Sequence, residues 1–461
     1  MNDKNKYTGV DLLGTAPVGT AIIRLALPMM VSMLSIAVYN MTDMFFIGQT
    51  GDANMVAAVS LAFPLFMLSL ALGNTFATGA SSYISRLLGA KNIDEARRAS
   101  AVSLYTTFCV GILLTSALLI FKTPILRLIG ASEATYSYTD DYFSVVALFM
   151  AFAASSTVMS GQMRSEGAAN KAMTLQLIGI SLNIILDPIF ILWLDMGTAG
   201  AAWATAAGQV ASFIYGLSYF FSKKTILSIN PVDYKPNKVM MIQILSIGIP
   251  SGINHIIMSV SQILANRILA SYGDHVVAGN GVQMRVTSIF FMLVLAIALG
   301  FQPFAGYNYG AKQFDRLRKG FKLTVILDTG LCIAGTIVLW LFGANLIRFF
   351  IDDTQTIEAG VAIMRIFVWG LPFIGLQITM MVTFQAFGKP AQAMIITMGR
   401  QFLFYIPLMF LLNHQFGFEG FVWAQPASDI LTTVIAVVLG ISLVKLMRGT
   451  DSSAHHSDTQ Q

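Results

Sequence analysis

Residues 22–47 read IIRLALPMMVSMLSIAVYNMTDMFFI, an apolar segment interrupted by one cation, Arg24, and one carboxylate, Asp43. A helix needs about 20 mostly apolar residues to cross the hydrocarbon core of a bilayer, so this segment is long enough to span a membrane. It is too long for the apolar core of a signal peptide, and no small-residue cleavage site follows it before a mature domain. We therefore interpret it as the first transmembrane helix.

Similar segments recur along the whole chain. Only 11% of the 461 residues are charged and 56% are hydrophobic, a balance that cannot cover the surface of a water-soluble protein of this size. Lipid offers no partner for backbone N–H and C=O groups, and no segment alternates like a strand of an outer-membrane barrel. We predict an all-α membrane protein with twelve transmembrane helices, at residues 22–47, 55–82, 101–121, 142–163, 172–194, 199–221, 243–270, 277–305, 321–343, 362–388, 393–413 and 420–446.

The positive charges follow this topology. With the N-terminus inside, most of the 28 Lys and Arg residues fall in cytoplasmic connections, as the positive-inside rule predicts. The cations on the opposite side are Lys122, Arg127, Arg267, Arg285, Arg348 and Arg365. The sequence therefore predicts a multi-pass protein of the plasma (inner) membrane with both termini in the cytoplasm, and we expect no nucleic-acid partner despite the basic pI of 9.1.

The two halves of the chain can be overlaid at an offset of about 222 residues. At this offset Pro28 falls on Pro250, and the Gly51-Asp52 pair falls on Gly273-Asp274. An offset shorter by one residue places Gly89-Ala90-Lys91 on Gly310-Ala311-Lys312. Six helices in each copy give parallel repeats. We expect five regions: a cytoplasmic N-terminus (1–21), an N-terminal six-helix lobe (22–221), a cytoplasmic linker (222–242), a C-terminal six-helix lobe (243–448) and a disordered cytoplasmic tail (449–461).

Two carboxylates stand out within predicted spans, Asp43 in 22–47 and Asp187 in 172–194. A charge at the middle of a membrane helix costs about 2.5–3.5 kcal/mol, so such residues are candidates for function. Counted back from the outer helix ends at about 1.5 Å per residue, both lie roughly 7–11 Å inside. Asn183 precedes Asp187 by one helical turn and shares its face. Thr205, on the span 199–221, is expected at a similar depth.

We assign supporting roles to two neighbours of Asp43 on the first span, Tyr39 and Asn40. Two carboxylates in a dry pocket cannot both remain ionised at low cost, because desolvation and mutual repulsion raise the pKa of the pair. A proton or a sodium ion would relieve this. The alternative is that each carboxylate caps or pairs with a local group, and that Asp187, which precedes Pro188, stabilises a kink.

Other charged residues within or beside the spans are expected to have structural roles. Asp328, Arg400 and Asp429 are candidates for structural ion pairs. Arg164 and Glu166, at the cytoplasmic end of the fourth span, are expected to pack at the interface.

These features together resemble the multidrug and toxic compound extrusion (MATE) family, from about Leu25 to Lys445. The resemblance is carried by the two six-helix halves and by several motifs: Leu27-Pro28 leading to Asp43, the two Gly-Ala-Lys turns, Arg164-Ser165-Glu166-Gly167, and Asn183 with Asp187-Pro188. It implies export of amphiphilic, often cationic organic compounds in exchange for inward H⁺ or Na⁺.

In one branch of that family the cation site uses an acid on helix 1, an Asn and an acid on helix 5, and a Thr on helix 6. The matching positions here are Asp43, Asn183, Asp187 and Thr205, which would also hold Na⁺ if sodium is the coupling ion. A second branch relies on acids in helices 7 and 10. The corresponding spans of this chain, 243–270 and 362–388, contain no Asp or Glu.

We therefore predict a secondary active multidrug efflux transporter that acts as a monomer in the lipid bilayer, with small amphiphilic drugs as substrates. No cofactor is expected beyond the coupling ion. The alternative is a flippase for a lipid-linked precursor, although such a cavity would carry cationic groups for pyrophosphate and the predicted midplane is acidic. An enzyme is not expected, because the sequence has no His-Glu-x-x-His zinc motif and no glycine-rich phosphate loop.

Pro28 is a candidate hinge, about four helical turns before Asp43. A proline inside a helix removes a backbone hydrogen bond and makes a local bend easier. The alternative is that Pro28 only marks the cytoplasmic entry of the first span.

Overall fold

The computed structural model describes residues 9–222 and 224–447, apart from the side chains of residues 40, 43, 44, 53 and 444–447, and this part of the chain is helical without strands. The predicted disordered tail, 449–461, lies outside the described residues. The first half contains α1 (Val10–Gly14), α2 (Val18–Gly48), α3 (Ala53–Leu61), α4 (Phe63–Gly89), α5 (Ile93–Ile120), α6 (Lys122–Leu128), α7 (Glu133–Ser165), α8 (Ala169–Pro188), the π-helix η2 (Ile189–Trp193) and α9 (Gly197–Phe220). After the 3₁₀ turn η3 (Pro231–Asp233), the second half contains α10 (Lys238–Ala270), α11 (Asp274–Gly310), α12 (Phe314–Phe350), α13 (Thr354–Phe367), α14 (Leu371–Ala386), α15 (Pro390–Met398), the π-helix η4 (Gly399–Tyr405) and α16 (Ile406–Met447).

Every predicted span corresponds to one helix or to consecutive helical segments. Nine helices of the described part are long and apolar enough to cross a membrane, and the bent pair α13 and α14 makes ten. The last of the nine extends from Pro390 to Leu443, and it is divided at Gly417, whose φ of 62° is not helical. Together with α9, these segments account for the twelve spans of a multi-pass membrane protein.

Two predicted spans are broken by proline. The span 55–82 consists of α3 and α4, which meet at Ala62, and Pro64 occupies the first turn of α4. The span 362–388 consists of α13 and α14, which meet at an angle of 58° immediately before Pro372. Proline fits the first turn of a helix but not its interior. Each break therefore falls where a new helix can begin.

The predicted repeat is visible in the backbone. Lys91 and Lys312 both adopt left-handed conformations, with φ of 61° and 56°. Each follows the last residue of a long helix by two positions, in α4 and in α11. A non-glycine residue with positive φ is uncommon, so its occurrence at equivalent positions supports the duplication. Gly51 and Gly273 also share positive φ, at 71° and 123°.

The chain divides into two compact units. Unit 1 contains Leu27–Ile256 and the residues up to Asp11, and unit 2 contains Leu12–Ala26 and the chain from Ile257 onward. These units differ from lobes that begin at 22 and 243, because the first part of α2 belongs to unit 2 and the first part of α10 belongs to unit 1. Close helix contacts explain this exchange.

Glycine allows both exchanged segments to pack. A Cβ added to Gly300 of α11 would lie 2.7 Å from the Cα of Ala26, inside unit 2. In unit 1, a Cβ at Gly79 of α4 would overlap the carbonyl of Ile244 in α10. Small residues let helix backbones approach closely, which favours helix association in lipid through van der Waals packing. The exchange thus depends on glycines whose role no local pattern indicated.

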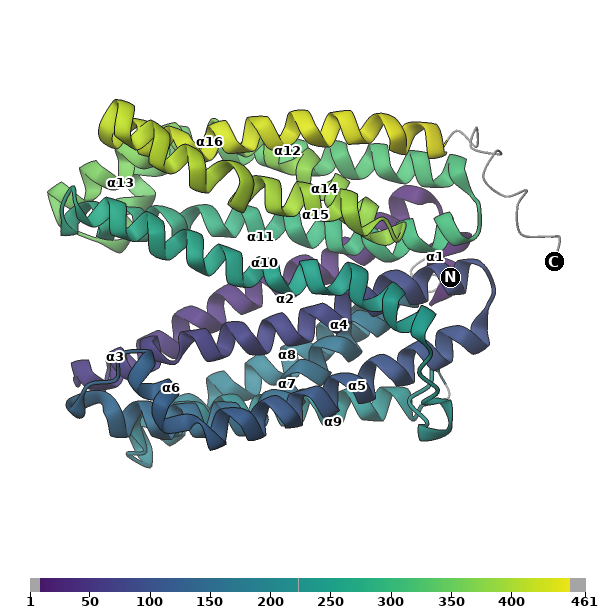
Figure 1. Cartoon of the computed structure of the whole chain (residues 1–461), viewed down its shortest axis with the longest axis horizontal. Helices are drawn as coiled ribbons and strands as arrows, with labels where there is room; N and C mark the ends of the chain where they lie inside the picture. Colours follow the sequence, from purple (N-terminus) through teal and green to yellow (C-terminus); the bar gives the residue numbers. More distant parts are fainter. Residues whose placement is uncertain (1–8, 223, 448–461) are drawn as a thin grey trace, which may run out of the picture. The chain divides into compact units, whose positions relative to one another are not determined.

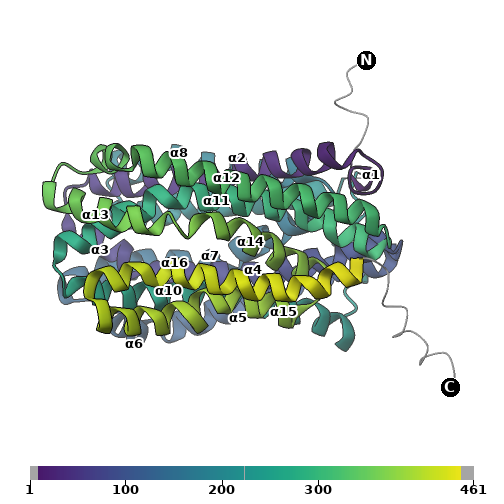
Figure 2. The same cartoon turned by 90° about the horizontal axis from the view of Figure 1, so that it is seen from above.

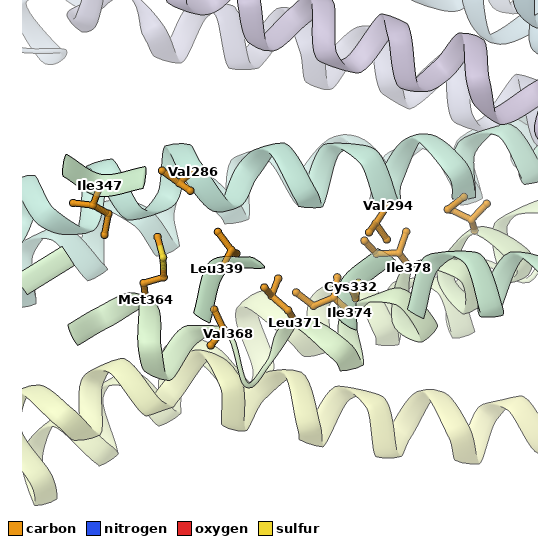
Figure 3. Close-up of a cluster of buried hydrophobic side chains, with 12 residues drawn as sticks. Val286, Val294, Cys332, Leu339, Ile347, Met364, Val368, Leu371, Ile374 and Ile378 are labelled. Atoms are coloured by element: carbon orange, nitrogen blue, oxygen red, sulfur yellow. The ribbon is translucent and has the colours of Figure 1, made fainter. Parts of the chain in front are cut away.

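Unit 1 is built from α4, α5, α7, α8 and α9, with α7 in contact with each of the others (Figure 1). Its core includes Leu65, Leu126, Phe143, Ala147 and Met150. In unit 2, α11, α12 and α14 are mutual neighbours, and α14 also contacts α16 (Figure 2). Figure 3 shows the apolar cluster between these helices, where Cys332 of α12 lies near Ile374 and Ile378 of α14.

Candidate ion-coupling site

Three predicted site residues meet inside unit 1. The side-chain amide of Asn183 donates to Asp187 Oδ1 over 3.2 Å along α8 and lies 3.2 Å from Thr205 Oγ1 on α9. Asp187 is completely buried, Asn183 is 3% exposed, and Thr205 is partly buried. The sequence-based placement of these three residues at one level is therefore confirmed, whereas their role in ion coupling stays a prediction.

A pair of glycines brings α8 and α9 close enough for this contact. Gly179 lies one turn before Asn183, and Gly208 lies three residues after Thr205. A Cβ added to Gly208 would lie only 2.5 Å from the carbonyl oxygen of Gly179. The crossing therefore requires glycine, since any larger residue would push the helices apart. This glycine pair was not predicted from the sequence, although each glycine lies about one turn from a polar residue of the cluster.

Asp187 lies at a change of helix type. α8 ends at Pro188, and the π-helix η2 continues from Ile189 to Trp193. Proline has no N–H and its ring clashes with the carbonyl four residues earlier, so a wider turn relieves the helix here. π-turns within helices often lie at functional sites. Either reading of Asp187, as a coupling carboxylate or as support for a kink, is compatible with this position.

The remaining predicted site residues lie on α2. The side chains of Asp43 and Asn40 lie outside the described part of the structure. Ile47 and Ile191 share one buried cluster, and each follows its carboxylate position by four residues, so backbone positions 43 and 187 lie at similar depth. Tyr39 is partly buried on α2.

Pro28 is buried within α2. It lies next to the point where this helix passes from unit 2 to unit 1, between Ala26 and Leu27. Its position is consistent with a hinge, and the role stays a prediction.

The cluster offers oxygen atoms to a hard cation or a proton. Asp187 supplies a carboxylate, Thr205 a hydroxyl, and Asn183 an amide oxygen that has no hydrogen-bond partner among the described residues. Sodium, like other hard cations, prefers oxygen ligands. These oxygen ligands suit a proton or an alkali cation.

A cavity in unit 1 adjoins this cluster. It has a volume of about 60 Å³ and is lined by α4, α7 and α9, with Phe66 and Phe149 on its apolar wall. Thr205 also lines it, with Gln209 one turn further along α9. Pockets for drug-sized ligands measure about 300–1,000 Å³, so this cavity has to widen to accept one. Thr205 thus lines the cavity and also contacts the buried side-chain amide of Asn183.

The other membrane charges differ in their partners. Arg400 Nε donates to Asp429 Oδ1 at 2.7 Å, which confirms an ion pair between these two residues. The expectation that Asp328 joins an ion pair is wrong for the described chain, since none of its salt bridges includes this residue. Asp328 Oδ2 instead lies within hydrogen-bond distance of the Thr379 hydroxyl oxygen, at 2.6 Å.

Glu166 fixes the segment that connects the two halves. Its carboxylate accepts hydrogen bonds from the Tyr219 and Thr225 hydroxyls and from the backbone N–H of Ile226. Burial is the largest influence on this group and raises its pKa above the ordinary value, although the hydrogen bonds lower it in part. The predicted packing role is therefore accompanied by a specific tether to the connecting segment.

Comparison with known proteins agrees with this architecture. A family model described as MatE matches residues 28–189 and 250–411, so its two copies begin at Pro28 and Pro250, at the offset of the internal repeat. The chain belongs to the MatE family. It is thus a MATE-family membrane transporter with the twelve-helix fold.

Among relatives, the multidrug export protein MepA of Staphylococcus aureus (strain MSSA476) is 30% identical over 426 residues, which cover 92% of this chain and 94% of MepA. MepA of Staphylococcus haemolyticus (strain JCSC1435) is 29% identical over 425 residues, which cover 92% of this chain and 93% of that protein. A crystal structure of MATE in complex with MaL6 has a TM-score of 0.91 and 25% identity, covering 96% of this chain and 99% of that chain. An outward-facing multidrug resistance MATE family transporter of the MOP superfamily has a TM-score of 0.90 and 25% identity, covering 96% and 100%.

Proposed function

We propose that this MATE-family transporter exports amphiphilic, often cationic organic compounds in exchange for protons or sodium ions that move inward. The coupling ion binds in unit 1 at Asp43, Asn183, Asp187 and Thr205, with Tyr39 and Asn40 in support. The observation that carries the proposal is the buried contact of Asn183 with both Asp187 and Thr205. The similarity to proteins named multidrug export protein supports the substrate class.

A buried carboxylate is costly without a proton or a cation. Asp187 has no exposed surface, and the Asn183 amide, a neutral donor, forms a hydrogen bond to its Oδ1. Binding of a coupling ion therefore changes the stability of this cluster by electrostatics, since desolvation penalises the ionised form. For this reason the stability of the cluster depends strongly on whether a coupling ion is bound.

Thr205 couples ion binding at the cluster to substrate binding in the cavity. It contacts Asn183 on one side and lines the aromatic cavity on the other. An ion that rearranges the Asn183 contacts also moves a wall of the cavity, so drug and ion binding are coupled reciprocally. Aromatic faces such as Phe66 and Phe149 suit cationic amphiphiles, because ring faces attract cations. The transporter is proposed to act as a monomer with both termini in the cytoplasm.

The test uses purified protein in liposomes loaded with a fluorescent cationic dye. Export is measured with a pH gradient alone, a sodium gradient alone, and neither. The wild type should respond to one gradient, and Asp187→Asn should lose that response while it still inserts. Asp195→Asn is the matched control, because Asp195 is exposed just beyond η2 with φ of 53°, which asparagine tolerates.

Gradient-driven export by Asp187→Asn at the wild-type rate would remove this carboxylate from the coupling mechanism. Loss of export in both variants would point to general damage at the outer end of α8. If the wild type moves no dye under either gradient, a fluorescent lipid-linked pyrophosphate tested in the same liposomes would distinguish the flippase alternative.

A further inference from the structure

One buried carboxyl group of unit 2 forms no ion pair among the described residues. Asp328 on α12 has no exposed surface, and its Oδ2 lies 2.6 Å from the hydroxyl oxygen of Thr379 on α14. The two helices touch at this level, since a Cβ added to Gly375 would lie 2.7–2.9 Å from backbone atoms of residues 328 and 329. Asp328 is therefore enclosed at a tight helix junction.

The hydrogen atoms available at this junction limit the charge of Asp328. The Thr379 hydroxyl lies 2.6 Å from Asp328 Oδ2 and 3.0 Å from the carbonyl oxygen of Gly375, but it carries only one hydrogen. If that hydrogen goes to Gly375, the shorter contact needs a proton on Asp328. If it goes to Asp328, the carboxylate has that single donor, because Oδ1 is buried without a partner among the described residues. Only the protonated acid satisfies both contacts.

Among the described residues, no Lys, Arg or His forms an ion pair with Asp328. On its own helix, Cys332 lies one turn further and belongs to the apolar cluster with Ile374 and Ile378 (Figure 3). From η4 and α16, Arg400 and Asp429 form an ion pair with each other. From α14 the contact is Thr379, and no salt bridge within the described chain reaches Asp328 from α11 or α13. An isolated buried carboxylate costs several kcal/mol.

We propose that Asp328 is a second proton-binding site of this transporter. Its carboxyl group holds a proton and donates a hydrogen bond to Thr379 Oγ1 while α12 and α14 are in contact, and it releases the proton to water when this junction opens during transport. Closure of the junction takes a proton up again, so the proton balance over a cycle is complete. The site contributes proton exchange from unit 2, and it does so although the spans 243–270 and 362–388 contain no acid.

The release step depends on the proposed transport function, but protonation of Asp328 does not. Infrared spectroscopy of purified protein tests protonation directly, because the C=O stretch of a protonated carboxyl group is separate from the carboxylate and amide bands. At neutral pH the wild type should show a component of this band that is missing from Asp328→Asn. Asp315→Asn is the matched control, since Asp315 lies on the same helix and its side chain is 92% exposed.

A second measurement counts protons moved per dye exported in liposomes. Asp328→Asn should export dye with about one proton fewer per cycle than the wild type and Asp315→Asn. An unchanged proton count in Asp328→Asn, or a wild type that moves dye without protons, would overturn proton exchange at this site. Absence of the infrared difference would overturn protonation, whichever ion drives export through unit 1.

Thr379→Val tests the same idea if Asp328→Asn does not fold. Valine is close in shape to threonine and keeps the acid, but it removes the acceptor of the proposed proton. The carboxyl band should persist and move to higher frequency, because a C=O stretch rises when the acid loses its hydrogen-bond partner. A band at the wild-type frequency would show that Thr379 does not accept from Asp328, and it would contradict the proposal.

Discussion

Replacement of Gly208 by alanine tests how the ion cluster is held together. The added methyl group would lie 2.5 Å from the carbonyl oxygen of Gly179, whereas ordinary contacts begin at 3.4 Å. α8 and α9 must therefore separate locally by about 0.9 Å, which stretches the 3.2 Å contact between Asn183 and Thr205 to about 4.1 Å. That distance is too long for a hydrogen bond. Overpacking of this kind costs about 1–3 kcal/mol.

The assay for Gly208→Ala combines thermal unfolding in detergent with gradient-driven dye export. We expect a lower Tm and a loss of coupled export, with binding of the dye retained. Gly330→Ala is the matched control, since a Cβ at this exposed helical position meets nothing within 4 Å. Its stability should be unchanged or slightly higher, because alanine favours a helix by about 1 kcal/mol over glycine. Wild-type export by Gly208→Ala would refute the idea that close helix contact positions the site.

Four further outcomes are expected. Asp43→Asn should insert normally but lose ion-coupled export, because it removes a titratable group and lowers the cost of insertion; normal gradient-driven efflux would exclude Asp43 from coupling. Asn183→Ala should reduce coupled export by roughly fivefold, the equivalent of about 1 kcal/mol for one neutral hydrogen bond, and a rate equal to wild type would contradict its role as a ligand. Pro28→Ala should bind drug normally but turn over more slowly if this proline is a hinge, and equal turnover would leave it a structural residue. Because burial raises the pKa of Glu166, the folded protein holds this proton more readily than the unfolded chain. The Tm of the wild type should therefore fall as pH rises through that pKa, whereas Glu166→Gln should lack this trend. Parallel pH profiles of Tm for the two proteins would show that Glu166 does not titrate in this range.

Much of the candidate site was predictable because it obeys helix geometry. Asn183 and Asp187 are four residues apart, so one helix must place them on the same face. Thr205 could be placed by counting inward from a helix end, since depth changes by a fixed rise per residue. Contacts that depend on interhelical packing were not predictable in this way. The Gly179 and Gly208 crossing and the Thr379 partner of Asp328 join residues with no common local pattern.

The sequence by itself determined the membrane class, the twelve spans and the duplication. These follow from the hydrophobic length that a bilayer requires, and from turns such as Lys91 and Lys312 that recur in both halves. Tertiary structure alone decided which unit holds the first parts of α2 and α10, and which buried charges are paired. Burial and ion pairing depend on where neighbouring helices approach, and that approach is set by small residues on two helices at once. For this reason Asp328 and Asp429, both acids within membrane helices, have different partners: the first contacts a threonine and the second an arginine.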